Sequence, residues 1–200
     1  MKFWQMALGL TAALAGCANT PPPPDWQLNA KGSLERAASA YLAGNSRVEA
    51  VEFARARAEV ARTGRIDLIA TVELSRCAWR VASLVFEDCA GFAPLAVDAG
   101  ATERDYAEYL QGKGRQPAAL AGIDDPLSRL VAAGVLLRSG RAEPTVLAQA
   151  VDTASAQGWS RPLLAWLNAQ ALRADAAGAG DEAARLRRRI ELVLAPPAPR

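Results

Sequence analysis

Residues 65–86, RIDLIATVELSRCAWRVASLVF, form the most hydrophobic helical stretch that the chain offers after its N-terminal segment. Apolar residues lie on nearly all sides of this helix, and only a narrow polar strip runs through Glu73, Arg76 and Arg80. A helix that is apolar on almost every side is normally covered by its neighbours. We therefore predict that residues 65–86 form the central helix, with Cys77 and Trp79 on its buried or partly buried surface.

Amphipathic segments with clear stop signals flank this stretch on both sides. Apolar residues recur at i, i+3, i+4 and i+7, and glycine or proline ends or begins each segment. Asp125 followed by Pro126 is typical of an N-cap and the first helical position. The further helices are expected from Ser33 to Gly44, Val48 to Gly64, Thr102 to Gly112, Asp125 to Gly140, Pro144 to Gly158, Ser160 to Ala176 and Asp181 to Pro196.

No run of alternating β-branched residues indicates a strand. The sequence thus predicts an all-α protein with about seven or eight helices, arranged as antiparallel hairpins in an array or as an irregular bundle. Residues 33–195 are expected to form a single domain, and residues 196–200 a disordered tail.

Glycines at the predicted turns recur at intervals of 18 to 20 residues, from Gly44 to Gly64, from Gly140 to Gly158 and from Gly158 to Gly178. A hairpin therefore recurs about every 38 residues, close to the period of paired-helix repeats. The helix–turn–helix pattern resembles that of tetratricopeptide repeats, in Trp166 to Ala184 and in Ala38, Tyr41, Gly44, Ala50, Phe53 and Ala56. The resemblance implies a right-handed array of hairpins.

The N-terminal segment ends in Leu14-Ala15-Gly16-Cys17, after a positive Met1-Lys2 and an apolar run. This pattern resembles the lipobox of bacterial lipoproteins. The resemblance implies that residues 1–16 are a signal peptide, that signal peptidase II cleaves between Gly16 and Cys17, and that acylated Cys17 anchors the protein in a bilayer. Ala18 after the cysteine implies the outer membrane, with the protein facing the periplasm. An ordinary secretory signal or a buried N-terminal helix that contains a cysteine is the alternative. A membrane-spanning helix is not expected, because the apolar run is shorter than the roughly 20 residues that a span needs.

Residues 17–32 are expected to form the lipidated N-terminus and a proline-rich linker. The four residues Pro21 to Pro24 favour an extended polyproline II conformation. Trp26 follows this run, and it could dock on the folded domain, at the membrane interface or in a partner.

Cys77 and Cys89 remain once Cys17 is assigned to the lipid, and a disulfide between them suits the periplasm. A disulfide needs Cα atoms within about 7 Å, whereas a continuous helix would separate these two by roughly 18 Å. The helix must therefore end near Phe86, and residues 87–91 are expected to form the turn. We expect no metal site, because the chain has no histidine and two cysteines do not complete an ordinary zinc set.

Catalytic signatures are sparse. Without histidine the usual base of serine and cysteine hydrolases is missing, and no phosphate loop or dinucleotide fingerprint occurs, so no cofactor is expected. Glu73 is the one candidate acid, acting on glycan as in helical lytic transglycosylases. The alternative is that Glu73 forms an ion pair with Arg76 or Arg80.

The remaining features concern binding. A formal net charge of +2 argues against nucleic acid as the partner. A cluster of arginines could contact an anionic partner or form a solvated helix face: Arg185, Arg187, Arg188 and Arg189. Trp159 and Trp166 could anchor a peptide or lie in the core. We interpret the chain as a membrane-anchored periplasmic scaffold or adaptor for another envelope protein or peptide; the alternative is a cell-wall glycan enzyme or its activator, so enzymatic activity stays open.

Overall fold

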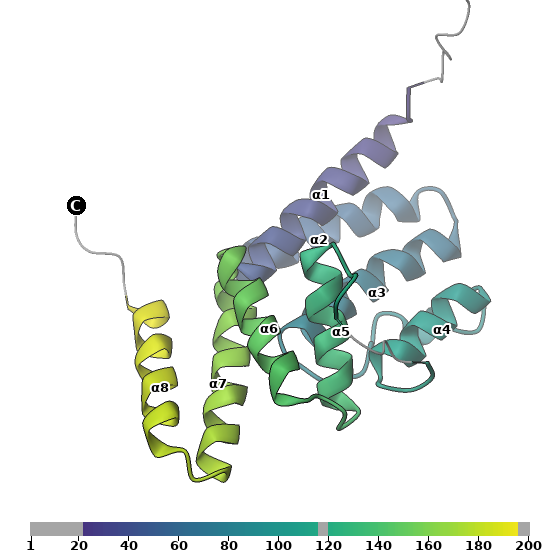
Figure 1. Ribbon diagram of the computed structural model, residues 1–200. Coiled ribbons are helices and arrows are strands. Elements are labelled where there is room, and N and C mark those ends of the chain that lie inside the picture. Colours follow the sequence, from purple (N-terminus) through teal and green to yellow (C-terminus); the bar gives the residue numbers. More distant parts are fainter. Residues whose placement is uncertain (1–21, 116–119, 196–200) are drawn as a thin grey trace, which may run out of the picture.

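The computed structural model describes residues 22–115 and 120–195, which form α-helices, one short 3-10 helix and no strand (Figure 1). This confirms the predicted all-α class. Cys17, Ala18 and the tail from residue 196 lie outside the described residues. The helices are α1 (Asp25–Leu42), α2 (Ser46–Ala61), α3 (Ile66–Ala82), α4 (Ala101–Leu110), α5 (Pro126–Arg138), α6 (Pro144–Ala156), α7 (Ser160–Ala176) and α8 (Gly180–Leu194), with η1 (Ala93–Leu95) before α4.

Local signals set most helix boundaries where the sequence predicts them. The Asp125 side chain accepts a hydrogen bond from the Ser128 N–H at 2.7 Å, so it caps α5 as expected. Asn45 caps α2 in the same way through the Val48 N–H at 3.1 Å. Gly44 and Gly158 follow α1 and α6 with φ of 87° and 67°, a left-handed conformation that glycine adopts without steric cost.

Two boundaries differ from the prediction by four residues or more. Helix α1 begins at Asp25, directly after Pro24, so the linker is shorter than residues 17–32. The acidic Asp25 in the first turn favours a helix start there, because a negative charge interacts well with the N-terminal end of the helix dipole. Trp26 therefore lies in the first turn of α1, partly exposed and outside both hydrophobic clusters of the body. The second difference, the early end of α3, shapes the candidate site.

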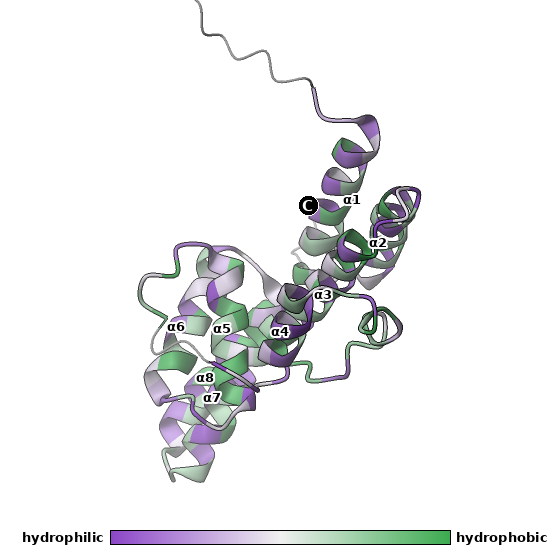
Figure 2. Ribbon diagram, turned by 90° about the vertical axis from the view of Figure 1, so that its right-hand side faces the viewer, coloured by the Kyte–Doolittle hydropathy of each residue, from purple (hydrophilic) through white to green (hydrophobic). Residues whose placement is uncertain are grey.

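Most helices pack against their neighbours in sequence: α1 with α2, α2 with α3, α5 with α6, α6 with α7, and α7 with α8. Helix α3 contacts α1, α2, α4 and α5, which confirms its central position. The start of α7 also contacts α1, and the Arg161 Nε donates to the Tyr41 carbonyl at 2.7 Å. The start of α1 and helix α8 lie on opposite sides of the molecule (Figures 1 and 2).

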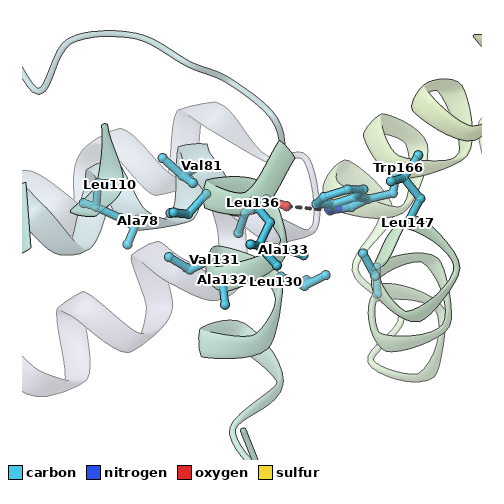
Figure 3. Close-up of a cluster of buried hydrophobic side chains, with 14 of the residues drawn as sticks. Ala78, Val81, Leu110, Leu130, Val131, Ala132, Ala133, Leu136, Leu147 and Trp166 are labelled. Atoms are coloured by element: carbon cyan, nitrogen blue, oxygen red, sulfur yellow. Dashed lines mark hydrogen bonds between the residues drawn. The ribbon is translucent and has the colours of Figure 1, made fainter. Parts of the chain in front are cut away.

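The hydrophobic side chains form two clusters that share α3. The smaller one joins α1, α2 and α3 around Tyr41, Phe53 and Trp79, and the Trp79 ring meets the Phe53 ring edge-on at 6.4 Å. The larger one joins α3 to helices α4–α8 (Figure 3). Helix α5 lies in its middle and is mostly apolar along its length (Figure 2). Trp79 and Cys77 are 4% and 9% exposed, as predicted for the surface of α3.

Helix α5 approaches α3 closely at Gly134. A Cβ atom at this position would overlap the Val81 carbonyl oxygen. Because only glycine leaves that space, the backbone of α5 rests directly on the last turn of α3. In residues 22–115 and 120–195, no helix combines the length and the hydrophobicity that crossing a bilayer requires.

Candidate functional site: a groove beside the disulfide

Helix α3 ends at Ala82, before the expected boundary at Phe86. Leu84 adopts a left-handed conformation with φ of 58°, the Leu84 N–H donates to the Val81 carbonyl, and the Val85 N–H donates to the Arg80 carbonyl. These two bonds form the Schellman arrangement that usually has glycine at the left-handed position. The predicted turn at residues 87–91 is therefore wrong: the chain reverses at Ser83 and Leu84, where the sequence carries no glycine to signal it.

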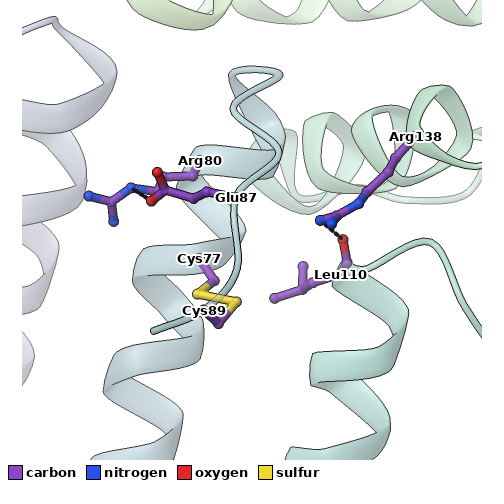
Figure 4. Close-up of a disulfide and its surroundings, with 6 residues drawn as sticks. All are labelled: Cys77, Arg80, Glu87, Cys89, Leu110 and Arg138. Atoms are coloured by element: carbon purple, nitrogen blue, oxygen red, sulfur yellow. Dashed lines mark hydrogen bonds and ion pairs between the residues drawn. A yellow bond between two sulfur atoms is a disulfide. The ribbon is translucent and has the colours of Figure 1, made fainter. Parts of the chain in front are cut away.

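Residues 85–91, which we name the strap, then run back along α3 (Figure 4). Glu87 forms an ion pair with Arg80 at 2.5 Å. Cys89 forms the predicted disulfide with Cys77, with Cα atoms 5.8 Å apart, which confirms the pairing. Further on, Gly91 lies against the Glu73 carboxyl group so closely that a Cβ atom there would overlap it.

These contact points lie on one face of α3, because positions 73, 77 and 80 are related by i, i+4 and i+7. The strap thus contacts α3 about once per helical turn. The disulfide is the covalent contact, and it lies between the ion pair of Glu87 with Arg80 and the close approach of Gly91 to Glu73.

Helix α2 faces the strap across α3. Arg57 Nε donates to Glu73 Oε1 at 2.6 Å. Arg76 binds Glu49 of α2 through two hydrogen bonds of 2.7 and 3.2 Å, and its guanidinium lies 4.4 Å from the centre of the Phe53 ring. The two ion pairs and the cation–π contact hold α2 and α3 at a fixed separation.

A groove of about 360 Å³ lies between α2 and the strap, with α3 as its floor. Arg76 and Arg80 come from the floor, Phe53 and Arg57 from α2, and the residues from Glu87 to Gly91 form the opposite wall. The Asp88 carboxylate stands exposed on this wall, and it has no hydrogen bond or ion pair with any residue in the described parts of the chain.

The prediction that Glu73 forms an ion pair with Arg76 or Arg80 is wrong. Neither Arg76 nor Arg80 pairs with it, because Glu49 binds the first and Glu87 the second, and Arg57 reaches it from α2 instead. Glu73 is 7% exposed and is covered by Gly91. Its ion pair with Arg57 joins α3 to α2, and its burial leaves the carboxyl group little surface for a substrate, so this geometry gives Glu73 a structural role.

The other buried carboxylates are paired as well. Glu52 accepts hydrogen bonds from Arg36 at 3.0 Å and from Arg55 at 2.7 Å. The hydrogen bond from Arg36 is the main cause that lowers the pKa of Glu52 below its ordinary value of 4.5. Every buried acid of the described chain, that is Glu49, Glu52 and Glu73, therefore serves to join helices.

The arginines of α8 do not form one patch. Arg185 pairs with Glu182 and Arg187 pairs with Asp175, whereas Arg188 and Arg189 are exposed without a partner among the described residues. Helical spacing places Arg187 away from the face shared by the other three.

Trp159 and Trp166 belong to the hydrophobic body. Trp166 is fully buried, which supports the core alternative, and Trp159 is partly buried against both hydrophobic clusters.

Residues 22–115 and 120–195 hold no group of three or more cysteine, aspartate or glutamate side chains that could bind a metal ion. We take the groove beside the disulfide as the candidate functional site, because charged side chains of α2, α3 and the strap come together there. Comparisons of this chain with protein-family models, curated protein sequences and solved structures gave no match.

Proposed function

We propose that this protein is a periplasmic lipoprotein of the outer membrane, anchored through acylated Cys17, whose helical body is a scaffold or adaptor for another envelope protein or peptide. The anchor and the location are supported by the lipobox-like Leu14 to Cys17 and by Ala18. The disulfide between Cys77 and Cys89 suits an oxidising compartment.

The observation that carries the binding function is the groove between α2 and the strap. It is open and polar, and ion pairs already engage Arg57, Arg76 and Arg80. Such a site offers polar side chains that can bind a partner, and ion pairs hold its walls in place. It has no unpaired acid and base side by side that could transfer protons in a reaction. These features favour a binding surface over an active site.

The anchor is tested with Cys17→Ser and metabolic labelling with an alkyne analogue of palmitate. We expect the wild type to carry the label and to appear as the cleaved form, and the variant to remain an unlabelled precursor. A variant that is cleaved and membrane-bound like the wild type would rule out lipidation at this residue.

The binding function is tested by placing a photo-crosslinking amino acid at Asp88 on the groove, and at Asp181 of α8 as the matched exposed control. Irradiation of intact cells should give one defined adduct from position 88 and not from position 181, and mass spectrometry identifies the partner. Identical products from both positions, or none from position 88, would contradict a partner at the groove. Glycan cleavage by the purified protein that Glu73→Gln abolishes would establish the enzyme instead.

A further inference from the structure

A cavity of about 370 Å³ lies between α6, the start of α5 and the loop before α5. This volume lies within the range of about 300–1,000 Å³ that is usual for small-molecule sites. The part of its lining that α6 provides shares one helical face, because the positions are related by i, i+3, i+4 and i+7: Gln149, Asp152, Thr153 and Ala156. Leu120, Ala121 and Arg129 complete the lining, and none of these residues lines the groove beside the disulfide.

Arg129 holds the loop before α5 and still has free donors. Its Nε and Nη2 atoms donate to the Ile123 carbonyl oxygen at 3.0 and 2.6 Å. A guanidinium group has five N–H donors, so three remain. Two of these three, one on each Nη atom, point away from the side-chain stem as the parallel pair that binds a carboxylate. Within the described parts of the chain Arg129 has no carboxylate partner.

Asp152 brings the opposite charge to the same cavity. Its carboxylate is exposed and forms no ion pair with Arg129 or with any other residue that the structure describes. The last turn of α6 contains no basic residue. The cavity thus carries one positive and one negative group on different helices, and each is open to a charge of a ligand.

The wall beside these two charges is largely apolar. Leu120 is 3% exposed and belongs to the larger hydrophobic cluster, while Ala121 and Ala156 add methyl groups at the surface. Thr153 is buried, and its hydroxyl donates to the Gln149 carbonyl at 2.7 Å, which fixes the position of this side chain. An apolar wall with a few convergent polar groups is typical of sites for small molecules.

We propose that this cavity binds a small zwitterion with an apolar side chain, either a free amino acid or a dipeptide. Its carboxylate pairs with Arg129, its ammonium group pairs with Asp152, and its side chain lies against the wall at Leu120. Charge selects this class of ligand, because an anion alone would face the unpaired Asp152 and a cation alone would face the unpaired Arg129. The inference goes beyond the proposed scaffold function and does not depend on it.

Isothermal titration calorimetry of the full-length protein in detergent tests the ligand. The probes, at millimolar concentration, are leucine, valine, methionine, phenylalanine and the homodipeptide of each. We expect a zwitterion to bind at a single site, and the series that binds identifies the amino acid or the dipeptide as the ligand. The N-acetyl derivative of the best ligand lacks the ammonium charge and its amide lacks the carboxylate. Each should bind about tenfold more weakly than the parent, because one charge of the cavity then stays unpaired.

Substitutions in the cavity test the pose. Asp152→Asn should weaken the zwitterion about tenfold and not weaken its N-acetyl derivative, which has no ammonium group to lose. Ala156→Leu fills the cavity from an exposed position and should weaken both ligands. Arg129→Lys keeps the charge without the planar pair of donors and should also weaken both. Two exposed controls, Arg141→Lys in the turn between α5 and α6 and Asp181→Asn on α8, should leave binding unchanged.

The proposal is overturned if none of the zwitterions binds, or if removal of either charge from the ligand leaves its affinity unchanged. Binding that persists undiminished in Asp152→Asn or in Ala156→Leu would also overturn it, because these two exposed positions can change without disturbing the core. A partner crosslinked from position 88 bears on the scaffold function alone, since the groove and this cavity have no lining residue in common.

Discussion

Trp166 donates its indole N–H to the carbonyl oxygen of Ala82 at 3.0 Å, which ties the middle of α7 to the last residue of α3 (Figure 3). The Trp166 side chain has no exposed surface. Its hydrogen bond therefore satisfies a buried carbonyl at the helix end from which the strap departs.

Trp166→Phe removes this bond and part of the buried ring. We expect the free energy of unfolding to fall by about 2–4 kcal/mol, because the Ala82 carbonyl loses its partner and a cavity forms. Chemical denaturation followed by circular dichroism measures the change. The control is Leu192→Ala on α8, where the side chain is 77% exposed and we expect a change within about 0.5 kcal/mol. Equal effects of the two substitutions would contradict the assignment of Trp166 to the core.

Gly134→Ala should destabilise the protein although alanine favours helix. The new methyl group overlaps the Val81 carbonyl, so α5 and α3 must move apart, at a cost of about 1–3 kcal/mol. Gly32→Ala in α1 is the matched control, because its methyl group meets only the Arg36 side chain, at 3.2 Å. This control should gain up to about 1 kcal/mol from helix propensity. Thermal unfolding of both variants measures these effects. Changes in melting temperature of the same sign in the two variants would be inconsistent with the close approach of α5 to α3.

Cys89→Ser should remove the disulfide that joins the strap to α3. Closing a loop of this size restricts the unfolded chain by on the order of 3 kcal/mol. We expect a lower melting temperature and proteolysis within residues 88–101, while the helix content measured by circular dichroism stays close to that of the wild type. Reductant should lower the melting temperature of the wild type and not lower that of the variant further. Free reaction of both Cys77 and Cys89 with a thiol reagent under denaturing, non-reducing conditions would show that the bridge is absent.

Acid should destabilise the protein partly through Glu52. In the folded protein Arg36 holds the pKa of Glu52 below its ordinary value of 4.5, so the unfolded state binds a proton at a higher pH than the folded state does. The stabilisation is therefore present above pH 4.5 and is lost as the pH falls through the folded pKa. Arg36→Met should reduce the drop in melting temperature between neutral and acidic pH. An equal drop in both proteins would contradict this contribution.

The helix class and most helix ends were predictable because the interactions that set them are local. The cap at Asp125 needs only the Ser128 N–H three residues on, and the turn at Gly158 needs only a residue that tolerates positive φ. The disulfide was predictable from cysteine parity, because Cys77 and Cys89 are the two cysteines that remain when Cys17 is assigned to the lipid.

The candidate groove was not predictable to the same extent, because its contacts join separate elements. Each guanidinium can reach several carboxylates, and the packing of α2 on α3 decides that Arg57, and not Arg76 or Arg80, binds Glu73. The left-handed Leu84 departs from the usual preference for glycine, so no sequence signal marks the reversal that makes the strap.

The sequence by itself thus determined the all-helical class, the hairpin turns and the paired cysteines, since interactions between residues close in the chain set all of these. Only the tertiary structure decided where α3 stops, which ion pairs form and how the strap lies. Those outcomes depend on how helices distant in sequence pack together, and that packing satisfies the buried Ala82 carbonyl and brings α5 onto Val81.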